Sequence, residues 1–199
     1  MKLNVPFYKQ ASISDCGPTA LRMVLSYYGK NPSINNNKEK CEIKKGKGIS
    51  TIQIAIAAAK FGYKSSLYTT SLGFKEDNME LEFYKKYADS NLIKGSNRLI
   101  KSAKDKGVEL NERSLSLREI KSLVNKNSLI IILLDWSVVF RKKNYLGHFV
   151  PIVGYDDKGI YVHNQGANAK KFLYINYTTF NKARKAKGTD EDILVISRK

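Results

Sequence analysis

The stretch that decides the fold of this chain is QASISDCGPTAL, residues 10–21. Apolar residues recur at helical spacing from Ala20 to Tyr28, which predicts a helix over 16–28. Pro18 is tolerated only in the first turn of a helix, so the helix begins close to Cys16, with Asp15 as its expected N-cap. The stretch therefore predicts a cysteine at a helix N-terminus, with a glutamine, Gln10, six residues before it.

A thiol in this position suits nucleophilic chemistry. Free N–H groups and the helix dipole at a helix N-terminus stabilise a thiolate, so we expect a lowered pKa for Cys16 and interpret it as a nucleophile. Gly17 is expected to leave room beside the sulfur for a substrate carbonyl. The backbone N–H of Cys16 and the side-chain amide of Gln10 are the expected donors to a developing oxyanion.

A histidine and an asparagine that could serve such a thiol follow far downstream. We expect strands over 148–155 and 160–164, joined by a tight turn at 156–159. This hairpin brings Asn164 close to His148, so that the Asn164 carbonyl could orient His148 as a base. His163 is the alternative base, but strand alternation places it on the face opposite Asn164.

Simpler interpretations of these residues exist. A cysteine at a helix start is often a small buried hydrophobe, and a lone histidine is often structural. The order of Gln10, Cys16, His148 and Asn164 favours a catalytic site instead. Cys41, in a lysine-rich segment, is interpreted as incidental. Two cysteines and two histidines show no zinc-ligand spacing, so we expect neither a metal nor a cofactor.

The remainder of the chain predicts helices first and an antiparallel sheet afterwards, which is an α+β fold. Segment 31–48 is polar and is expected to be a mobile loop, and segment 73–115 holds no motif that we can place. Ser116 and Glu119 form a predicted capping box. The other expected helices span 52–61, 76–88, 91–106, 117–125 and 177–185, and the other expected strands span 5–9, 63–70, 129–135 and 192–197.

Composition sets further limits. The 199 residues predict a single domain over 1–199, and 42% hydrophobic residues are typical of a globular protein. The net charge of +17 could attract an anionic partner, although lysine outnumbers arginine and no RNA-binding aromatic motif is visible, so nucleic acid is not expected. The apolar run Leu129–Leu134 is too short to cross a membrane, and the first residues lack a signal core. These features predict a cytoplasmic protein.

The motifs resemble a known family. Residues 10–28, with their Asp-Cys-Gly-Pro-Thr-Ala-Leu core, residues 147–156 and residues 160–164 are similar to the C39 and C39-like cysteine peptidases. This resemblance implies a papain-like fold and a peptide or protein substrate. It also implies Cys16 as nucleophile, His148 as base, Asn164 as orienting residue and Gln10 in the oxyanion hole. The third catalytic residue is usually Asp in the C39 branch, whereas the Asn at position 164 resembles the papain branch.

The tail carries a second resemblance. Residues 180–184 and 188–194 are similar to the end of the guanylyl-cyclase-domain-containing family, whose name implies cyclisation of GTP. A two-metal cyclase needs carboxylates gathered at one point. The candidates are Asp156, Asp157, Asp190, Glu191 and Asp192, which are more simply interpreted as a turn and a loop.

Three hypotheses follow from these patterns. The preferred one is a cysteine hydrolase that cleaves a peptide or amide bond. The second is a nucleotide-handling protein, although the chain has no glycine-rich phosphate loop of the P-loop type. The third is a non-catalytic binding module that kept the fold and holds an anionic partner through its basic surface.

Overall fold

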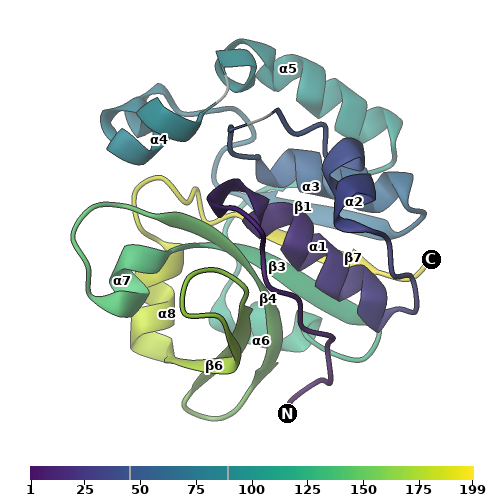
Figure 1. Cartoon of the computed structure of the whole chain (residues 1–199), viewed down its shortest axis with the longest axis vertical. Helices are drawn as coiled ribbons and strands as arrows, with labels where there is room; N and C mark the ends of the chain where they lie inside the picture. Colours follow the sequence, from purple (N-terminus) through teal and green to yellow (C-terminus); the bar gives the residue numbers. More distant parts are fainter. Residues whose placement is uncertain (45, 89) are drawn as a thin grey trace.

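A seven-stranded sheet in the order β2-β1-β7-β3-β4-β5-β6 forms the centre of the protein (Figure 1). The computed structural model describes residues 1–44, 46–88 and 90–199. Its strands are β1 (Lys64–Thr69), β2 (Glu109–Glu112), β3 (Ser128–Asp135), β4 (Gly147–Tyr155), β5 (Gly159–Asn164), β6 (Lys170–Asn176) and β7 (Ile193–Ser197). All neighbouring pairs are antiparallel except β1 and β2, which are parallel. The mixed helices and sheet confirm the predicted α+β class.

Strand β3 is the most deeply buried strand, because seven of its eight residues, all but Ser128, are buried. A continuous apolar run of this length is typical of a strand that is covered on both faces. It pairs with β7 on one side and with β4 on the other. Its register with β4 sets Leu134 opposite His148 and Asp135 opposite Gly147. His148 therefore lies at the end of the sheet where β3 finishes.

The α-helices are α1 (Cys16–Tyr27), α2 (Ile34–Lys40), α3 (Thr51–Lys60), α4 (Glu82–Tyr87), α5 (Ser90–Asp105), α6 (Leu117–Leu123), α7 (Trp136–Phe140) and α8 (Tyr177–Arg184), with 3-10 turns η1 (Ile13–Asp15) and η2 (Glu76–Glu80). Figure 1 shows α1, α2, α3 and α5 gathered in one part of the molecule, and α7 and α8 together in another. Helix α1 packs on β4, and α3 packs on β1. Among the described residues, no helix is both long and apolar enough to cross a membrane.

Helix α1 begins at Cys16, as expected, and ends before Gly29, whose φ of +89° is a left-handed conformation that glycine adopts without strain. Gly17 has a different role from the expected one. A Cβ at this position would lie 2.7 Å from Ile49 Cγ2 and 2.9 Å from Ile54 Cδ1. The small size of Gly17 therefore makes room for side chains that pack against α1, not for a substrate.

Several expected elements differ from the observed ones in the N-terminal part. Residues 5–9 form no strand, because this segment runs across the sheet end from Leu3, which bonds Val153, to Gln10, which bonds Gln165. The expected loop over 31–48 contains helix α2. Ser33 caps this helix, and buried Asn37 donates to the Pro18 carbonyl at 3.1 Å. Contact with α1 thus stabilises a helix of weak propensity.

The expected helix over 76–88 is divided into η2 and α4, because Leu81 has an extended backbone (φ −80°, ψ 123°). The remaining helices and strands match the predicted ones to within two residues at most ends, and the capping box of Ser116 and Glu119 on α6 is confirmed. Strands β2 and β6 and helices α2 and α7 were not expected from the sequence.

Candidate active site

The Cys16 thiol lies at the junction of α1 and β4. Cys16 is only 8% exposed, and burial raises the pKa of its thiol although the backbone N–H groups of Phe149, Gly17 and Cys16 itself act to lower it. The expected lowering of this pKa is therefore wrong for the protein in this state, because loss of hydration outweighs the helix N-terminus. The expected capping is also absent, since the Asp15 carboxylate pairs with Lys38 at 2.8 Å.

His148 and Asn164 meet at the adjacent ends of β4 and β5. The His148 Nε2 and Asn164 Oδ1 atoms are 3.2 Å apart. Asn164 Nδ2 donates to the carbonyls of Ala167 and Asn168 at 3.0 and 3.1 Å, and its Oδ1 also accepts from the Gly166 N–H at 3.0 Å. Because these bonds fix the amide orientation, Asn164 presents an acceptor to the ring. His148 must therefore carry its proton on Nε2, which leaves Nδ1 as an acceptor.

The His148 ring is held in a dry environment. It is 6% exposed, the Trp136 ring lies 4.7 Å from it between centroids, and a Cβ at Gly166 would approach His148 Cε1 to 3.1 Å. Burial lowers the pKa of His148 to about 4, against the opposing effect of the Asn164 bond. At neutral pH the imidazole is therefore uncharged. Cys16 begins α1, which packs on β4, the strand that carries His148. Both the Cys16 thiol and the His148 imidazole are uncharged at neutral pH.

The backbone of Gln10 lies beside Gln165, the residue that follows Asn164. The Gln10 backbone N–H donates to the Gln165 carbonyl at 3.0 Å, but its side-chain Nε2 donates to the Ser12 carbonyl at 2.9 Å and not toward Cys16. Of the four predicted residues, His148 and Asn164 are in contact through their side chains. Gln10 is bonded through its backbone to Gln165, and its side-chain amide is bonded to Ser12.

Gln165 is a buried residue that sequence reasoning missed. It is 1% exposed, and its Nε2 donates to the carbonyls of Cys16 (3.0 Å) and Phe149. It therefore ties the start of α1 to β4 directly beside the thiol. Its position immediately after Asn164 is the only signal in the sequence that could have indicated it.

The alternative base, His163, and the second cysteine, Cys41, lie elsewhere. His163 is fully buried, its Nε2 lies 3.0 Å from the Val5 carbonyl, and its Nδ1 accepts from the Phe172 N–H at 3.2 Å. It is thus committed to structural bonds on the other face of β5. Cys41 is 1% exposed at the end of α2, and burial raises its pKa to about 12.

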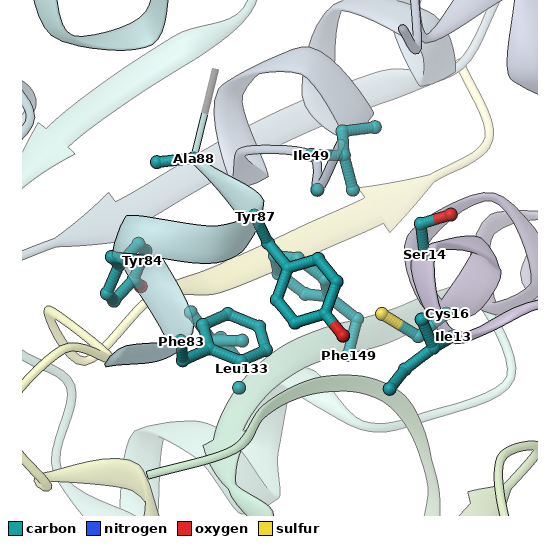
Figure 2. Close-up of a pocket in the computed structure, with 12 residues that line it drawn as sticks. Ile13, Ser14, Cys16, Ile49, Phe83, Tyr84, Tyr87, Ala88, Leu133 and Phe149 are labelled. Atoms are coloured by element: carbon teal, nitrogen blue, oxygen red, sulfur yellow. The ribbon is translucent and has the colours of Figure 1, made fainter. Parts of the chain in front are cut away.

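A pocket lies beside Cys16, with about 580 Å³ of empty space that is in part open to solvent (Figure 2). Its walls come from η1, the segment before α3, helix α4, and strands β3 and β4. The residues that line it are Ile13, Ser14, Cys16, Gly48, Ile49, Phe83, Tyr84, Tyr87, Ala88, Leu133, Gly147 and Phe149.

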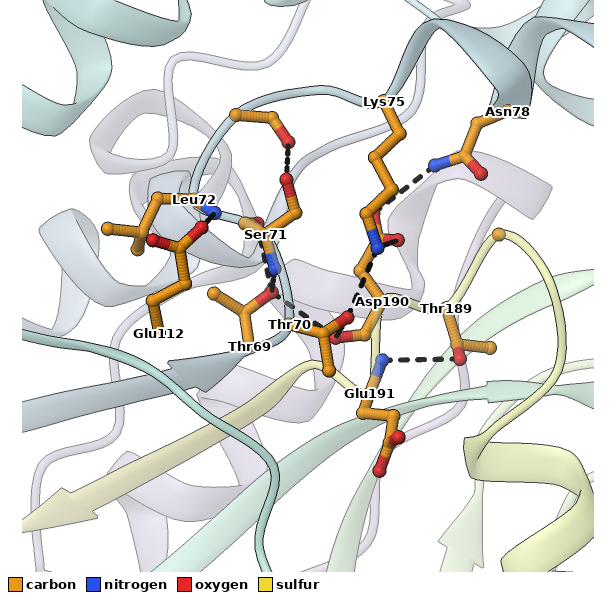
Figure 3. A network of polar contacts seen from close by, with 12 residues as sticks. Thr69, Thr70, Ser71, Leu72, Lys75, Asn78, Glu112, Thr189, Asp190 and Glu191 are labelled. Carbon is orange, nitrogen blue, oxygen red and sulfur yellow. Dashed lines mark hydrogen bonds and ion pairs between the residues drawn. The ribbon is translucent and has the colours of Figure 1, made fainter.

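Part of the tail forms a structural clasp, which we define as residues 187–190 with their partners in 75–84. Asp190 accepts from Lys75 at 3.0 Å and from Asn78 at 3.2 Å (Figure 3). Tyr84 donates to the Gly188 carbonyl, and Lys187 pairs with Glu80. The clasp therefore anchors η2 and α4, and with them one wall of the pocket beside Cys16.

Four of the five carboxylates considered for metal binding, all but Asp157, have local partners instead. These pairs are Asp156 with the N–H groups of Lys158 and Gly159, Asp190 with Lys75, Glu191 with Arg184, and Asp192 with Thr51. Within the described parts of the chain, no three His, Cys, Asp or Glu residues are grouped so that they could hold a metal ion. The residues present therefore do not fit the two-metal site that a cyclase of that type would need.

The architecture defines the class of fold. A double glycine motif protease from an AMS/PCAT transporter, solved with a leader peptide, matches over all of this chain and 94% of its own, with a TM-score of 0.60 and 16% identity. A C39-like peptidase from Bacillus anthracis matches with a TM-score of 0.61 and 13% identity, over all of this chain and 98% of its own. The chain thus has the papain-like fold of C39 peptidase domains, as predicted.

Sequence comparison assigns the family within that fold. The family model described as guanylylate cyclase matches residues 5–196, and the chain belongs to this family. A relative from Arabidopsis thaliana named Guanylyl cyclase 1 is 28% identical over 212 residues, which cover 98% of this chain and 76% of that protein. Both resemblances seen in the sequence, to C39 peptidases and to the cyclase-named family, are confirmed.

Proposed function

We propose that this protein is a thiol hydrolase that cleaves a peptide or amide bond with Cys16, His148 and Asn164. The observation that carries the proposal is the bond of 3.2 Å between Asn164 Oδ1 and His148 Nε2. His148 lies on β4, and the helix that begins with Cys16 packs on this strand. This bond fixes the tautomer in which His148 Nδ1 can accept a proton, which is the state that a general base needs.

The pKa shifts indicate how the reaction would start. A buried thiol with a raised pKa and a ring with a lowered pKa form a neutral pair, not an ion pair. Cys16 Sγ would attack the carbonyl carbon while its proton passes to His148 Nδ1. The C–N bond would then break as His148 returns the proton to the leaving amine. Water, deprotonated by His148, would hydrolyse the thioester, release the acid and restore the thiol.

The oxyanion requires donors that are aimed at the carbonyl oxygen. The Cys16 backbone N–H is at the free end of α1 and is one candidate. Gln10 is the other, and its amide would have to leave the Ser12 carbonyl, to which it now donates at 2.9 Å. Catalytic hydrogen bonds often form only when substrate binds, so this rotation is compatible with the role. The side-chain Oε1 atom of Gln10 is buried without a hydrogen-bond partner, so it loses no bond when the amide rotates.

The test is the rate at which iodoacetamide alkylates Cys16, with Cys41 as the internal reference. At about pH 7.5, we expect His148→Ala to slow Cys16 alkylation by at least about tenfold, as loss of a general base does. Asn164→Ala should slow it less, and His163→Gln should not change it. Peptide mapping by mass spectrometry separates the two thiols. Equal rates in the wild-type protein and His148→Ala would refute the proposal, as would peptide hydrolysis by Cys16→Ala.

Cyclisation of GTP is a second candidate, because the family model and the Arabidopsis relative carry that name. It predicts formation of cyclic GMP from GTP with Mg²⁺ or Mn²⁺, unaffected by Cys16→Ala. Mass spectrometry of the nucleotide products tests it. Cyclic GMP in the wild-type protein and in Cys16→Ala at equal rates would favour this candidate over the hydrolase.

A further inference from the structure

The pocket beside Cys16 is apolar in a strongly basic protein. The chain has a net charge of +17, yet none of the described residues that line the pocket carries a charge. A phosphate or carboxylate group would therefore find no cation there. The space of about 580 Å³ beside these residues is in part continuous with open solvent. The lining of the pocket thus suits an uncharged group.

Aromatic side chains of α4 form the wall that faces the thiol. Phe83 and Tyr87 contact each other with their ring centroids 5.1 Å apart, and Figure 2 shows Tyr87 extending from α4 into the pocket, toward the side where Cys16 lies. Leu133 and Phe149, paired across β3 and β4, line the pocket from the sheet. Offset or edge-to-face contact with these rings would favour an aromatic guest.

The wall is fixed in place, so the pocket is preformed. The Tyr84 hydroxyl donates to the Gly188 carbonyl, and Gly48 N–H donates to the Tyr87 carbonyl at 2.9 Å. These bonds hold α4 to the tail on one side and to the segment before α3 on the other. Ile13, 59% exposed, adds apolar surface beside the thiol. A guest would therefore gain apolar contact without having to order the wall first.

We propose that this pocket binds a large apolar side chain of the substrate, aromatic by preference, next to the bond that Cys16 attacks, and that Tyr87 determines this specificity. The proposal rests on the proposed function of Cys16 as a nucleophile. It names the substrate class as a peptide or amide with a bulky hydrophobic residue beside the scissile bond.

The experiment compares two chloroacetamides that share one reactive group. The probes are 2-chloro-N-(2-phenylethyl)acetamide and 2-chloro-N-(2-hydroxyethyl)acetamide, and glutathione gives their intrinsic rate ratio. In each case the Cys16 sulfur displaces chloride and forms a thioether. Transfer of a phenyl group from water to an apolar pocket is favourable, so we expect the phenylethyl probe to label Cys16 at least about tenfold faster, after correction by the glutathione ratio.

Tyr87→Ser should bring the corrected ratio close to one. The matched control is Tyr174→Ser, because Tyr174 is 43% exposed on β6 and does not line the pocket. A corrected ratio near one in the wild-type protein overturns the proposal without any variant. An equal fall of the corrected ratio in Tyr87→Ser and Tyr174→Ser also overturns it. If the aromatic preference persists but His148→Ala labels as fast as wild type, the catalytic role of Cys16 fails while the preference of the pocket stands.

Discussion

Burial of a neutral His148 should make the stability of the protein depend on pH. The pKa of His148 is about 4 in the folded protein and 6.5 ordinarily, so the unfolded chain takes up a proton at a pH where the folded chain does not. The stabilisation is complete above about pH 6.5 and is lost as the pH falls toward 4. Between about pH 7.5 and pH 5 the two pKa values give a loss of about 2 kcal/mol.

The perturbation is His148→Gln, which removes the titrating group and keeps a polar side chain. Urea unfolding followed by the fluorescence of Trp136, the single tryptophan, gives the free energy of unfolding at both pH values. Over this interval, we expect the wild-type protein to lose about 2 kcal/mol more than the variant. The His163→Gln variant should still show the part of the fall in unfolding free energy between about pH 7.5 and pH 5 that is due to His148. A difference below about 0.5 kcal/mol between wild type and His148→Gln would show that His148 is not held neutral by burial.

Three further predictions concern stability, each measured by urea unfolding at neutral pH. In the clasp, Asp190→Ala should lower the free energy of unfolding by about 1 kcal/mol, because the contacts of Asp190 with Lys75 and Asn78 are lost. Asp190→Asn should lower it less, because asparagine tolerates the left-handed φ of +47° at this position. In the core, Leu134→Ala should cost about 2–5 kcal/mol because Leu134 is fully buried, and a cost below about 1 kcal/mol would contradict its place there. At the start of α6, Ser116→Ala should cost about 1 kcal/mol by removing the cap, and an unchanged stability would mean that the capping box contributes nothing.

The local signals in the sequence predicted the helix at Cys16 and the hairpin that joins His148 to Asn164. Pro18 and the recurrence of apolar residues determine the first, and a strong turn at 156–159 determines the second, so both depend on residues close in the chain. The capping box at Ser116 is of the same kind. These signals were sufficient to predict the contact between His148 and Asn164 and the position of Cys16 at the start of α1.

Features that depend on distant residues could not be predicted. Helix α2 is stabilised by Asn37 against Pro18, a contact that the composition of 31–48 does not reveal. The space at Gly17 is filled by Ile49 and Ile54. The direction in which the pKa of Cys16 is shifted was also predicted wrongly. The position of Cys16 at a helix start is visible in the sequence, but the burial of its thiol is not.

The position of β7 in the sheet has a consequence for how the chain folds. Strand β7 lies between β1 and β3, so β1 and β2 join the other strands only through residues 193–197. Until those residues have left the ribosome, the earlier strands can form only two separate sheets, each with an unpaired edge. The β1–β7 pairing also spans more than half of the chain, and such non-local contacts slow folding. A nascent or truncated chain that lacks residues 193–197 should therefore be prone to aggregation and should depend on chaperones until the sheet is closed.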